Sequence, residues 1–105
     1  MKVRSTIGSS DWKSPACKCK TWIEHWCNNT NEKHFPAKCP NCKKKVENAS
    51  DWDGAHVRKV DSEDKKFYIT PLCSSCNSKP GLEFDVDVKY LVRANAIYCS
   101  NKYNK

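Results

Sequence analysis

Two cysteine pairs with identical spacing constrain this chain more than any other feature. Cys39 and Cys42 form the first CxxC pair, and Cys73 and Cys76 form the second. Each pair presents two thiolates on one tight turn, and four thiolates from two turns match the tetrahedral coordination of zinc. We therefore predict that these four cysteines bind one Zn²⁺. Because four sulfurs fill the coordination shell, the predicted role of this zinc is structural.

The size of the chain makes such a metal important for stability. Of the 105 residues, 38% are hydrophobic in a count that includes eight cysteines, so we predict one domain with a small core. In a domain of this size, the binding free energy of a structural zinc becomes folding free energy. We expect zinc removal to unfold much of the domain.

A disulfide framework in a secreted protein is the alternative use of eight cysteines. The first residues argue against it, because Lys2 and Arg4 are followed by no apolar stretch of the kind that a signal peptide carries. No apolar run is long enough to cross a bilayer either. We therefore expect a reducing, cytoplasmic setting. Residues 1–16 are polar, which predicts a flexible N-terminal arm ahead of one zinc-stabilised domain in residues 17–105.

The remaining cysteines suggest a second structural zinc. Cys17 and Cys19 are too close in sequence to form a site without other ligands, and binding Cys99 as well would fix both ends of the chain to the core. The fourth ligand is either Cys27, which is the softer donor, or His25, which lies on the same predicted helical turn. In the alternative interpretation these thiols are free and only one zinc is bound.

Hydrophobic periodicity predicts two short helices near the cysteines. Thr21 is a suitable cap for a helix in which Trp22 and Trp26, four residues apart, share one apolar face. That spacing is typical of packing against a core. A second short helix is expected after Cys73, and Pro80 ends it.

Alternating patterns predict the strands. Residues 55–60 and 67–70 are expected to form a β-hairpin that Pro71 ends. Residues 83–88 alternate as a further strand, and residues 90–97 are predicted to form a short helix that leads toward the last cysteine.

The charge of the chain indicates a modest basic surface. The formal net charge is +7 with every cysteine counted as neutral. Zinc with four thiolates carries about −2, so one site lowers the net charge to about +5 and two sites lower it to about +3. Such a basic surface either keeps the protein soluble or binds a polyanion such as nucleic acid. The basic side chains that we expect around the first zinc turn and the hairpin are Lys43, Lys44, Lys45, Arg58 and Lys59.

The order of these features resembles the HNH endonuclease family, whose zinc-stapled ββα-metal core is a variant of the treble-clef fold. The resemblance covers roughly residues 39–80. It implies a small α+β domain with a β-hairpin, short helices and few other regular elements. The wider pattern of Cys-x-Cys, Trp-x-x-His-Trp, Gly-Ala-His-Val and Tyr-Ile-x-Pro-Leu-Cys is similar to a group of small HNH-like zinc proteins of bacteria and phages, which has no established activity.

The resemblance also implies catalytic positions. His56 falls where the family has its general base, and Asn77 takes the place of the final metal-binding histidine. Ala55 stands at the position of the acidic metal ligand and offers no oxygen, while Tyr68 lies near the position of the usual asparagine. Asp53 is a poor substitute from two residues earlier. Because phosphodiester cleavage needs a metal as well as a base, these substitutions argue against an enzyme.

Three functions are compatible with these features. We favour a non-catalytic zinc module that contacts DNA or RNA through the five basic residues named above. The second hypothesis is a metal-dependent endonuclease in which His56 activates water and Asn77 helps to hold Mg²⁺. The third is a structural or protein-interaction domain, for which no partner can be named. The third hypothesis predicts no salt-dependent binding to nucleic acid.

Overall fold

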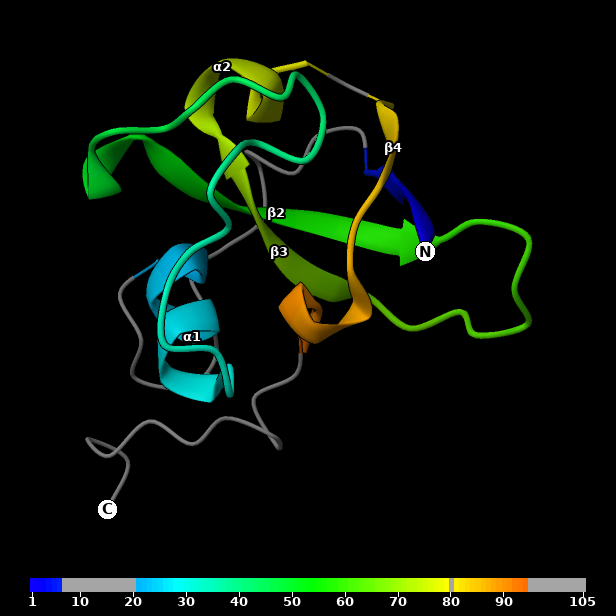
Figure 1. Ribbon diagram of the computed structural model, residues 1–105. Coiled ribbons are helices and arrows are strands. Elements are labelled where there is room, and N and C mark those ends of the chain that lie inside the picture. Colours follow the sequence, from blue (N-terminus) through cyan, green and yellow to red (C-terminus); the bar gives the residue numbers. More distant parts are fainter. Residues whose placement is uncertain (7–20, 80, 95–105) are drawn as a thin grey trace.

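The computed structural model describes residues 1–6, 21–79 and 81–94, which form a five-stranded antiparallel sheet and two α-helices (Figure 1). The strand order is β4-β1-β2-β3-β5. In chain order the elements are β1 (Lys2–Ser5), α1 (Trp22–Asn29), the 3-10 helix η2 (Ala49–Asp51), β2 (Trp52–Lys59), β3 (Tyr68–Cys73), α2 (Ser74–Asn77), β4 (Glu83–Asp85), the 3-10 helix η3 (Val88–Tyr90) and β5 (Val92–Arg93). The predicted α+β class is confirmed, with a larger sheet than the hairpin expected. Among these residues no helix has the length and apolar character that crossing a bilayer requires.

The first strand, β1, lies inside the sheet rather than in a loose arm. Val3 is paired with Lys59 of β2 on one side and with Phe84 of β4 on the other. The backbone and side chain of Ser5 add two hydrogen bonds to Leu82, of 2.8 and 2.9 Å. The expectation of a flexible arm is therefore wrong for residues 2–5, and its residues 7–16 lie outside the described residues.

The predicted hairpin is present and longer than expected. Strands β2 and β3 pair from Trp52 opposite Cys73 to Val57 opposite Tyr68, so β3 continues through Pro71 to the second cysteine pair. The expected end at Pro71 is thus wrong. Strand β5 pairs only with Tyr68 and Ile69, which leaves Pro71 at a sheet edge where proline is tolerated.

The C-terminal half of the sheet also differs from expectation. Strand β4 has three residues, and Val88 starts η3 with 56% of its surface exposed instead of continuing the strand. The predicted helix over residues 90–97 is wrong for residues 92 and 93, which form β5, and residues 95–97 lie outside the described residues. These two residues pair with the edge of β3 instead of forming a helix. In short segments such tertiary contacts often override the local preference for a helix.

Helix α1 covers one face of the central strands. Thr21 caps it as predicted, accepting a 3.2 Å hydrogen bond from the backbone N–H of Glu24. The buried Trp26 side chain packs with Ile69 and Val92 of the sheet. Its ring also stacks on Phe35 with 5.3 Å between ring centroids, so the apolar face of the helix is core, as the four-residue spacing predicted.

Gly54 of β2 allows this close packing. A β-carbon added to Gly54 would lie 2.5 Å from the carbonyl carbon of Trp22 and 2.6 Å from the backbone nitrogen of Ile23. Only glycine lets the helix backbone approach the strand so closely. The opposite face of the sheet carries a second core that includes Val3, Val57 and Phe84.

Candidate metal centre

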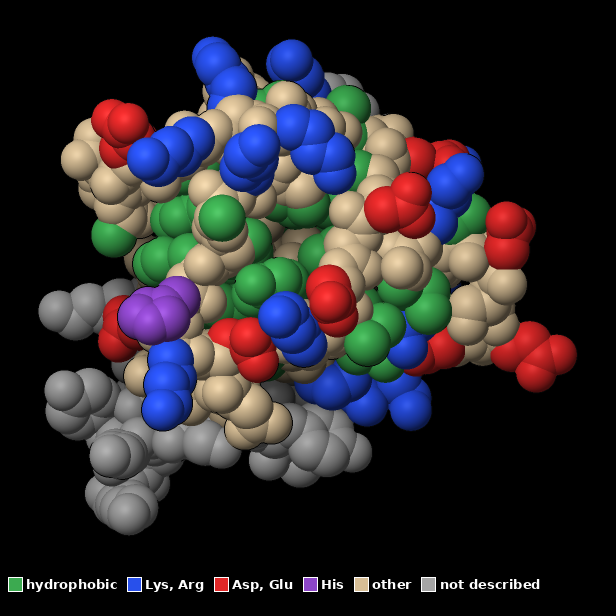
Figure 2. Space-filling view, viewed as in Figure 1, with side chains coloured by type: hydrophobic (Ala, Val, Ile, Leu, Met, Phe, Trp, Pro, Cys, Tyr) green, Lys and Arg blue, Asp and Glu red, His purple; other side chains and the backbone are tan. Residues whose placement is uncertain are grey.

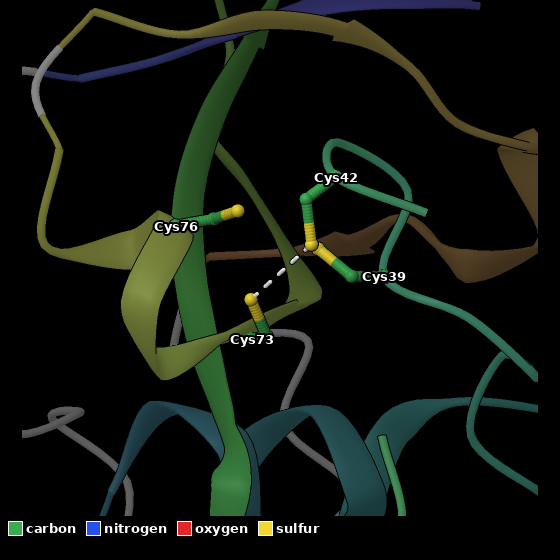
Figure 3. Close-up of side chains that lie close together, drawn as sticks. All are labelled: Cys39, Cys42, Cys73 and Cys76. Atoms are coloured by element: carbon green, nitrogen blue, oxygen red, sulfur yellow. Dashed lines mark hydrogen bonds between the residues drawn. The ribbon is translucent and has the colours of Figure 1, made fainter. Parts of the chain in front are cut away.

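The two cysteine pairs meet at the end of the hairpin (Figure 3). Cys39 and Cys42 lie on a turn that the isolated bridge between Lys38 and Lys45 closes. Cys73 is the last residue of β3, and α2 begins directly after it and carries Cys76. The four Sγ atoms lie within 4.8 Å of one another. The structure therefore brings together the four residues predicted for the first metal site.

The size of this cluster fits a tetrahedral metal. With metal–sulfur bonds of about 2.3 Å, the sulfurs of a zinc tetrathiolate are about 3.8 Å apart. The Sγ atoms of Cys42 and Cys73 are 3.8 Å apart, and the other sulfur pairs lie within the 4.8 Å limit. Four cysteines in this arrangement can hold a metal ion such as zinc.

Backbone and amide groups shape the first cysteine turn. The N–H of Cys39 donates to the carbonyl of Lys44, and the N–H of Lys43 donates back to the carbonyl of Cys39, each at 2.9 Å. Lys43 has a φ of 65°, a left-handed conformation that costs a non-glycine residue about 1 kcal/mol. The Nδ2 group of Asn41 donates to the Sγ of Cys76 at 3.3 Å, which links the first turn to α2.

The local electrostatics differ among the sulfurs. Burial raises the pKa of the Cys73 thiol to about 12 and also raises the pKa of Cys76. Burial opposes ionisation of Cys39 as well, but backbone N–H groups of Cys42, Cys73 and Asn41 outweigh it and lower its pKa to about 7. A divalent cation at the centre would favour the thiolate form of all four. Without it, four close sulfurs cannot ionise together.

The second predicted zinc site lies mostly outside the described residues. Cys17, Cys19 and Cys99 belong to the segments that the structure does not describe. Of the two alternative fourth ligands, Cys27 is exposed on α1, whereas His25 is fully buried. The Nε2 atom of His25 lies 2.9 Å from the carbonyl oxygen of Arg93 and, because a carbonyl only accepts, donates a proton there. A metal would have to use the other ring nitrogen, and the second zinc stays a prediction.

The predicted general base is buried beneath α1. His56 is 1% exposed, and its ring lies edge-on to Trp22 with 4.3 Å between centroids. Burial, together with the nearby His25, lowers the pKa of His56 to about 4. The imidazole is therefore neutral at pH 7, but with so little of its surface exposed it is not open to a phosphodiester from solvent.

Asn77 contacts the Asp53 carboxylate and not His56. Its Nδ2 atom donates to one oxygen of the Asp53 carboxylate at 3.1 Å, while the hydroxyl of Ser74 donates to the other oxygen at 3.0 Å. Asp53 and His56 are three residues apart on β2, so their side chains leave opposite faces of the strand. The structure thus groups Asn77 with Asp53 and does not bring it to His56. Sequence reasoning did not foresee this Asp53, Ser74 and Asn77 cluster.

The five predicted basic residues separate into two groups at opposite ends of β2. Lys43, Lys44 and Lys45 are exposed on the first cysteine turn, where Figure 2 shows basic side chains gathered over that turn and α2. Arg58 and Lys59 end β2, an eight-residue strand about 25 Å long. These two groups therefore do not form one continuous patch.

Comparison with known proteins gives no relative: no protein-family model matches the chain, and no curated protein or solved structure is significantly similar to it. The HNH-like interpretation therefore rests on the motifs and their order.

Proposed function

We propose that the four cysteines bind a structural Zn²⁺ and that this protein is a non-catalytic, HNH-like zinc module that binds nucleic acid. The observation that carries the proposal is the position of three consecutive exposed lysines, Lys43 to Lys45, on the turn that supplies two of the sulfurs. The metal fixes the turn, and the turn presents the lysines.

The order of the elements supports the treble-clef interpretation. A cysteine turn closed by the bridge of Lys38 with Lys45 comes first, and the hairpin of β2 and β3 follows. Helix α2 starts at the second pair, with Cys73 at its N-cap and Cys76 in its single turn. An all-sulfur tetrahedral set suits zinc, which would hold these three pieces together without redox chemistry.

The lysines of the turn are available to a polyanion. Lys44 and Lys45 form no ion pair within 4.0 Å and no side-chain hydrogen bond with any residue that the structure describes. Lys43 donates to the carbonyl of Pro40 at 2.8 Å and keeps its charge exposed. A zinc tetrathiolate carries about −2 and would repel a phosphate, so these cations also screen the metal centre from an approaching nucleic acid.

The surroundings of His56 support a module without nuclease activity. Its ring is covered by Trp22, and the neighbouring Ala55 offers no metal ligand. The Asn77 amide is turned so that its nitrogen, a donor that cannot bind a cation, faces the Asp53 carboxylate. Metal-assisted cleavage needs a base and a metal-bound phosphate at one place.

The test is the salt dependence of binding to a labelled 20-base-pair DNA duplex and its RNA counterpart, measured by fluorescence anisotropy on the zinc-loaded chain. Each phosphate contact contributes about −0.9 to the slope of log K against log salt for duplex DNA. We expect the slope to become less negative by about 2 in the double variant Lys44→Gln and Lys45→Gln. The matched control is Lys65→Gln, an exposed lysine in the hairpin loop at the far end of β2, which should leave the slope unchanged.

Two results would overturn the proposal. Binding without salt dependence, or an equal slope in the double variant, would leave a structural or protein-interaction domain. Cleavage of plasmid DNA or RNA in Mg²⁺ or Mn²⁺ that disappears in His56→Ala, with zinc content retained, would make the protein a nuclease. Native mass spectrometry of the same sample reports how many zinc ions are bound and tests the second site directly.

A further inference from the structure

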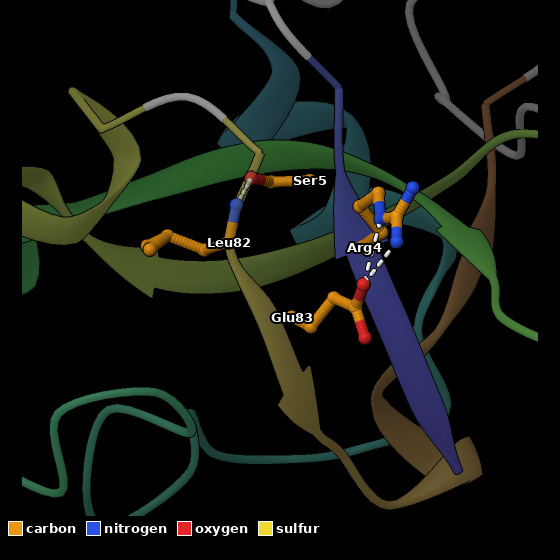
Figure 4. Close-up of polar contacts among 4 residues, drawn as sticks. All are labelled: Arg4, Ser5, Leu82 and Glu83. Carbon is orange, nitrogen blue, oxygen red and sulfur yellow. Dashed lines mark hydrogen bonds and ion pairs between the residues drawn. The ribbon is translucent and has the colours of Figure 1, made fainter.

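Two arginines lie opposite each other on neighbouring strands, at the end of β2 that is farther from the cysteine cluster. Arg4 of β1 is directly paired with Arg58 of β2. Like charges in directly opposite positions on adjacent strands repel each other. Glu83 of β4, which is paired with Arg4 on its other side, forms an ion pair with the Arg4 guanidinium (Figure 4). One of the two positive charges is thus compensated within the fold.

Arg58 has no such partner. Its guanidinium carbon lies 5.1 Å from the centroid of the Phe67 ring, and it forms no ion pair or hydrogen bond with the residues described here. Stacking on an aromatic ring fixes the plane of a guanidinium and leaves its N–H edge available. The exposed Arg58 side chain therefore offers an oriented fork of donors. Such a fork matches two oxygens of a phosphate or a carboxylate.

A groove lies beside this pair of arginines. It has a volume of about 600 Å³ and is lined by Arg4, Arg58 and Lys59 on the strand side and by residues 60–65 of the hairpin loop. Binding sites for small molecules have volumes of about 300–1,000 Å³. The groove is therefore large enough for a small molecule that carries an anionic group.

Two other charged side chains of the groove, Lys59 and Asp64, are paired with each other. The Nζ atom of Lys59 lies 3.2 Å from the Asp64 carboxylate, which also accepts a 2.6 Å hydrogen bond from the Tyr68 hydroxyl. The Tyr68 hydroxyl and the Lys66 backbone N–H, with Lys59, hold the pKa of Asp64 well below its usual range. Asp61 and Glu63 also line the groove, so an extended polyanion would meet several negative charges there. A single compact anion can reach Arg58 without meeting all of them.

We propose that Arg58, assisted by Arg4, binds the phosphate group of a small phosphorylated molecule in this groove. The Arg58 fork would bind two phosphate oxygens, and the adjacent Arg4 would add positive charge while it remains paired with Glu83. A phosphate dianion gains more from two neighbouring guanidinium groups than a monocarboxylate does. This site is separate from Lys43 to Lys45, and it does not depend on the nucleic-acid proposal.

The test is a titration of the zinc-loaded chain with inorganic phosphate, followed by the arginine Nε–H signals in ¹H–¹⁵N NMR at constant ionic strength. We expect a saturable shift of the Arg58 signal in the wild type. In Arg58→Gln the Arg4 signal reports binding, and we expect it to be at least about tenfold weaker than in the wild type. Arg58→Lys, which keeps the charge and loses the fork, should also bind more weakly. Lys33→Gln is the control, because this exposed lysine does not line the groove. It should change the affinity by less than about twofold.

Separate titrations with sodium acetate and with a 12-base-pair DNA duplex distinguish the sources of the anion. Weaker binding of acetate, and no shift of the Arg58 signal by the duplex, support the proposal. Equal affinity for acetate, a linear response to phosphate, or unchanged affinity in Arg58→Gln would overturn it. A larger Arg58 shift with duplex than with phosphate would overturn it as well, because the groove would then belong to the nucleic-acid surface.

Discussion

The two α-helices of this domain are held in place by different forces. Helix α1 has eight residues, a side-chain cap from Thr21 and a buried tryptophan packed against the sheet. Helix α2 has four residues and no side-chain cap hydrogen bond, and its buried residue is the metal-ligand candidate Cys76. A four-residue helix is far below the length at which helices are stable by themselves. Packing therefore maintains α1, whereas α2 depends on the sulfur cluster.

The strongest way to test this difference is to remove one sulfur. We expect Cys76→Ser to lose the metal of the first site and to lower the free energy of unfolding by on the order of 5 kcal/mol, a fraction of the binding energy of a structural zinc. Native mass spectrometry gives the zinc content, and hydrogen exchange should show lost protection first in α2 and in the turn of Cys39 and Cys42.

The matched control is Cys27→Ser, a cysteine that is exposed on α1. If one zinc is bound, this variant keeps the wild-type zinc content and stability. A loss of one of two zinc ions would instead identify Cys27 as a ligand of the second site. Wild-type zinc content and stability in Cys76→Ser would contradict the dependence of α2 on the metal.

A substitution at Gly54 should disturb α1 without touching the sulfurs. The β-carbon of Gly54→Ala would lie 2.5 Å from the Trp22 backbone, so the helix has to move away from the strand. Overpacking of this kind costs about 3 kcal/mol. Denaturant unfolding measures the loss, and zinc stoichiometry should remain that of the wild type.

Gly81→Ala is the comparison for this variant. Gly81 has a φ of 65°, but no atom lies within 4 Å of a β-carbon added there. Only the left-handed backbone conformation opposes the change, at a cost of about 1 kcal/mol. If Gly54→Ala proved no more destabilising than Gly81→Ala, the close packing of α1 on β2 would be wrong.

The pH dependence of stability tests the environment beneath α1. Burial lowers the pKa of His56 from 6.5 to about 4. Because the folded state resists protonation, the stability due to neutral His56 is present above pH 6.5 and is lost as the pH falls toward 4. The pKa difference corresponds to at most about 3 kcal/mol.

The measurement compares the free energy of unfolding between pH 7 and pH 5 in wild type and in His56→Gln. Acid also releases metal from cysteines, but it does so in both proteins. We expect a smaller loss of stability in the variant, whereas the exposed control His34→Gln should follow the wild type. Identical pH dependence in wild type and His56→Gln would place His56 in contact with solvent.

The sequence predicted the parts of the structure that a short motif with known chemistry specifies. The CxxC spacing identified the sulfur cluster, and the Thr21 cap with two tryptophans four residues apart identified α1. The pattern did not reveal β5, because Val92 and Arg93 become a strand only through pairing with β3. The burial of His56 was equally hidden, since it follows from the position of α1 over Gly54. Such contacts join segments that are distant in sequence.

The central position of β1 has a consequence for the order of folding. Residues 2–5 leave the ribosome before either neighbouring strand exists. Their partners in β2 and β4 lie more than about fifty and about eighty residues further along the chain. Closing such long loops is slow, so completion of the sheet is expected to be a late event during synthesis. The hairpin of β2 and β3, with its two cysteine turns, is local enough to form earlier and to serve as the template on which β1 docks.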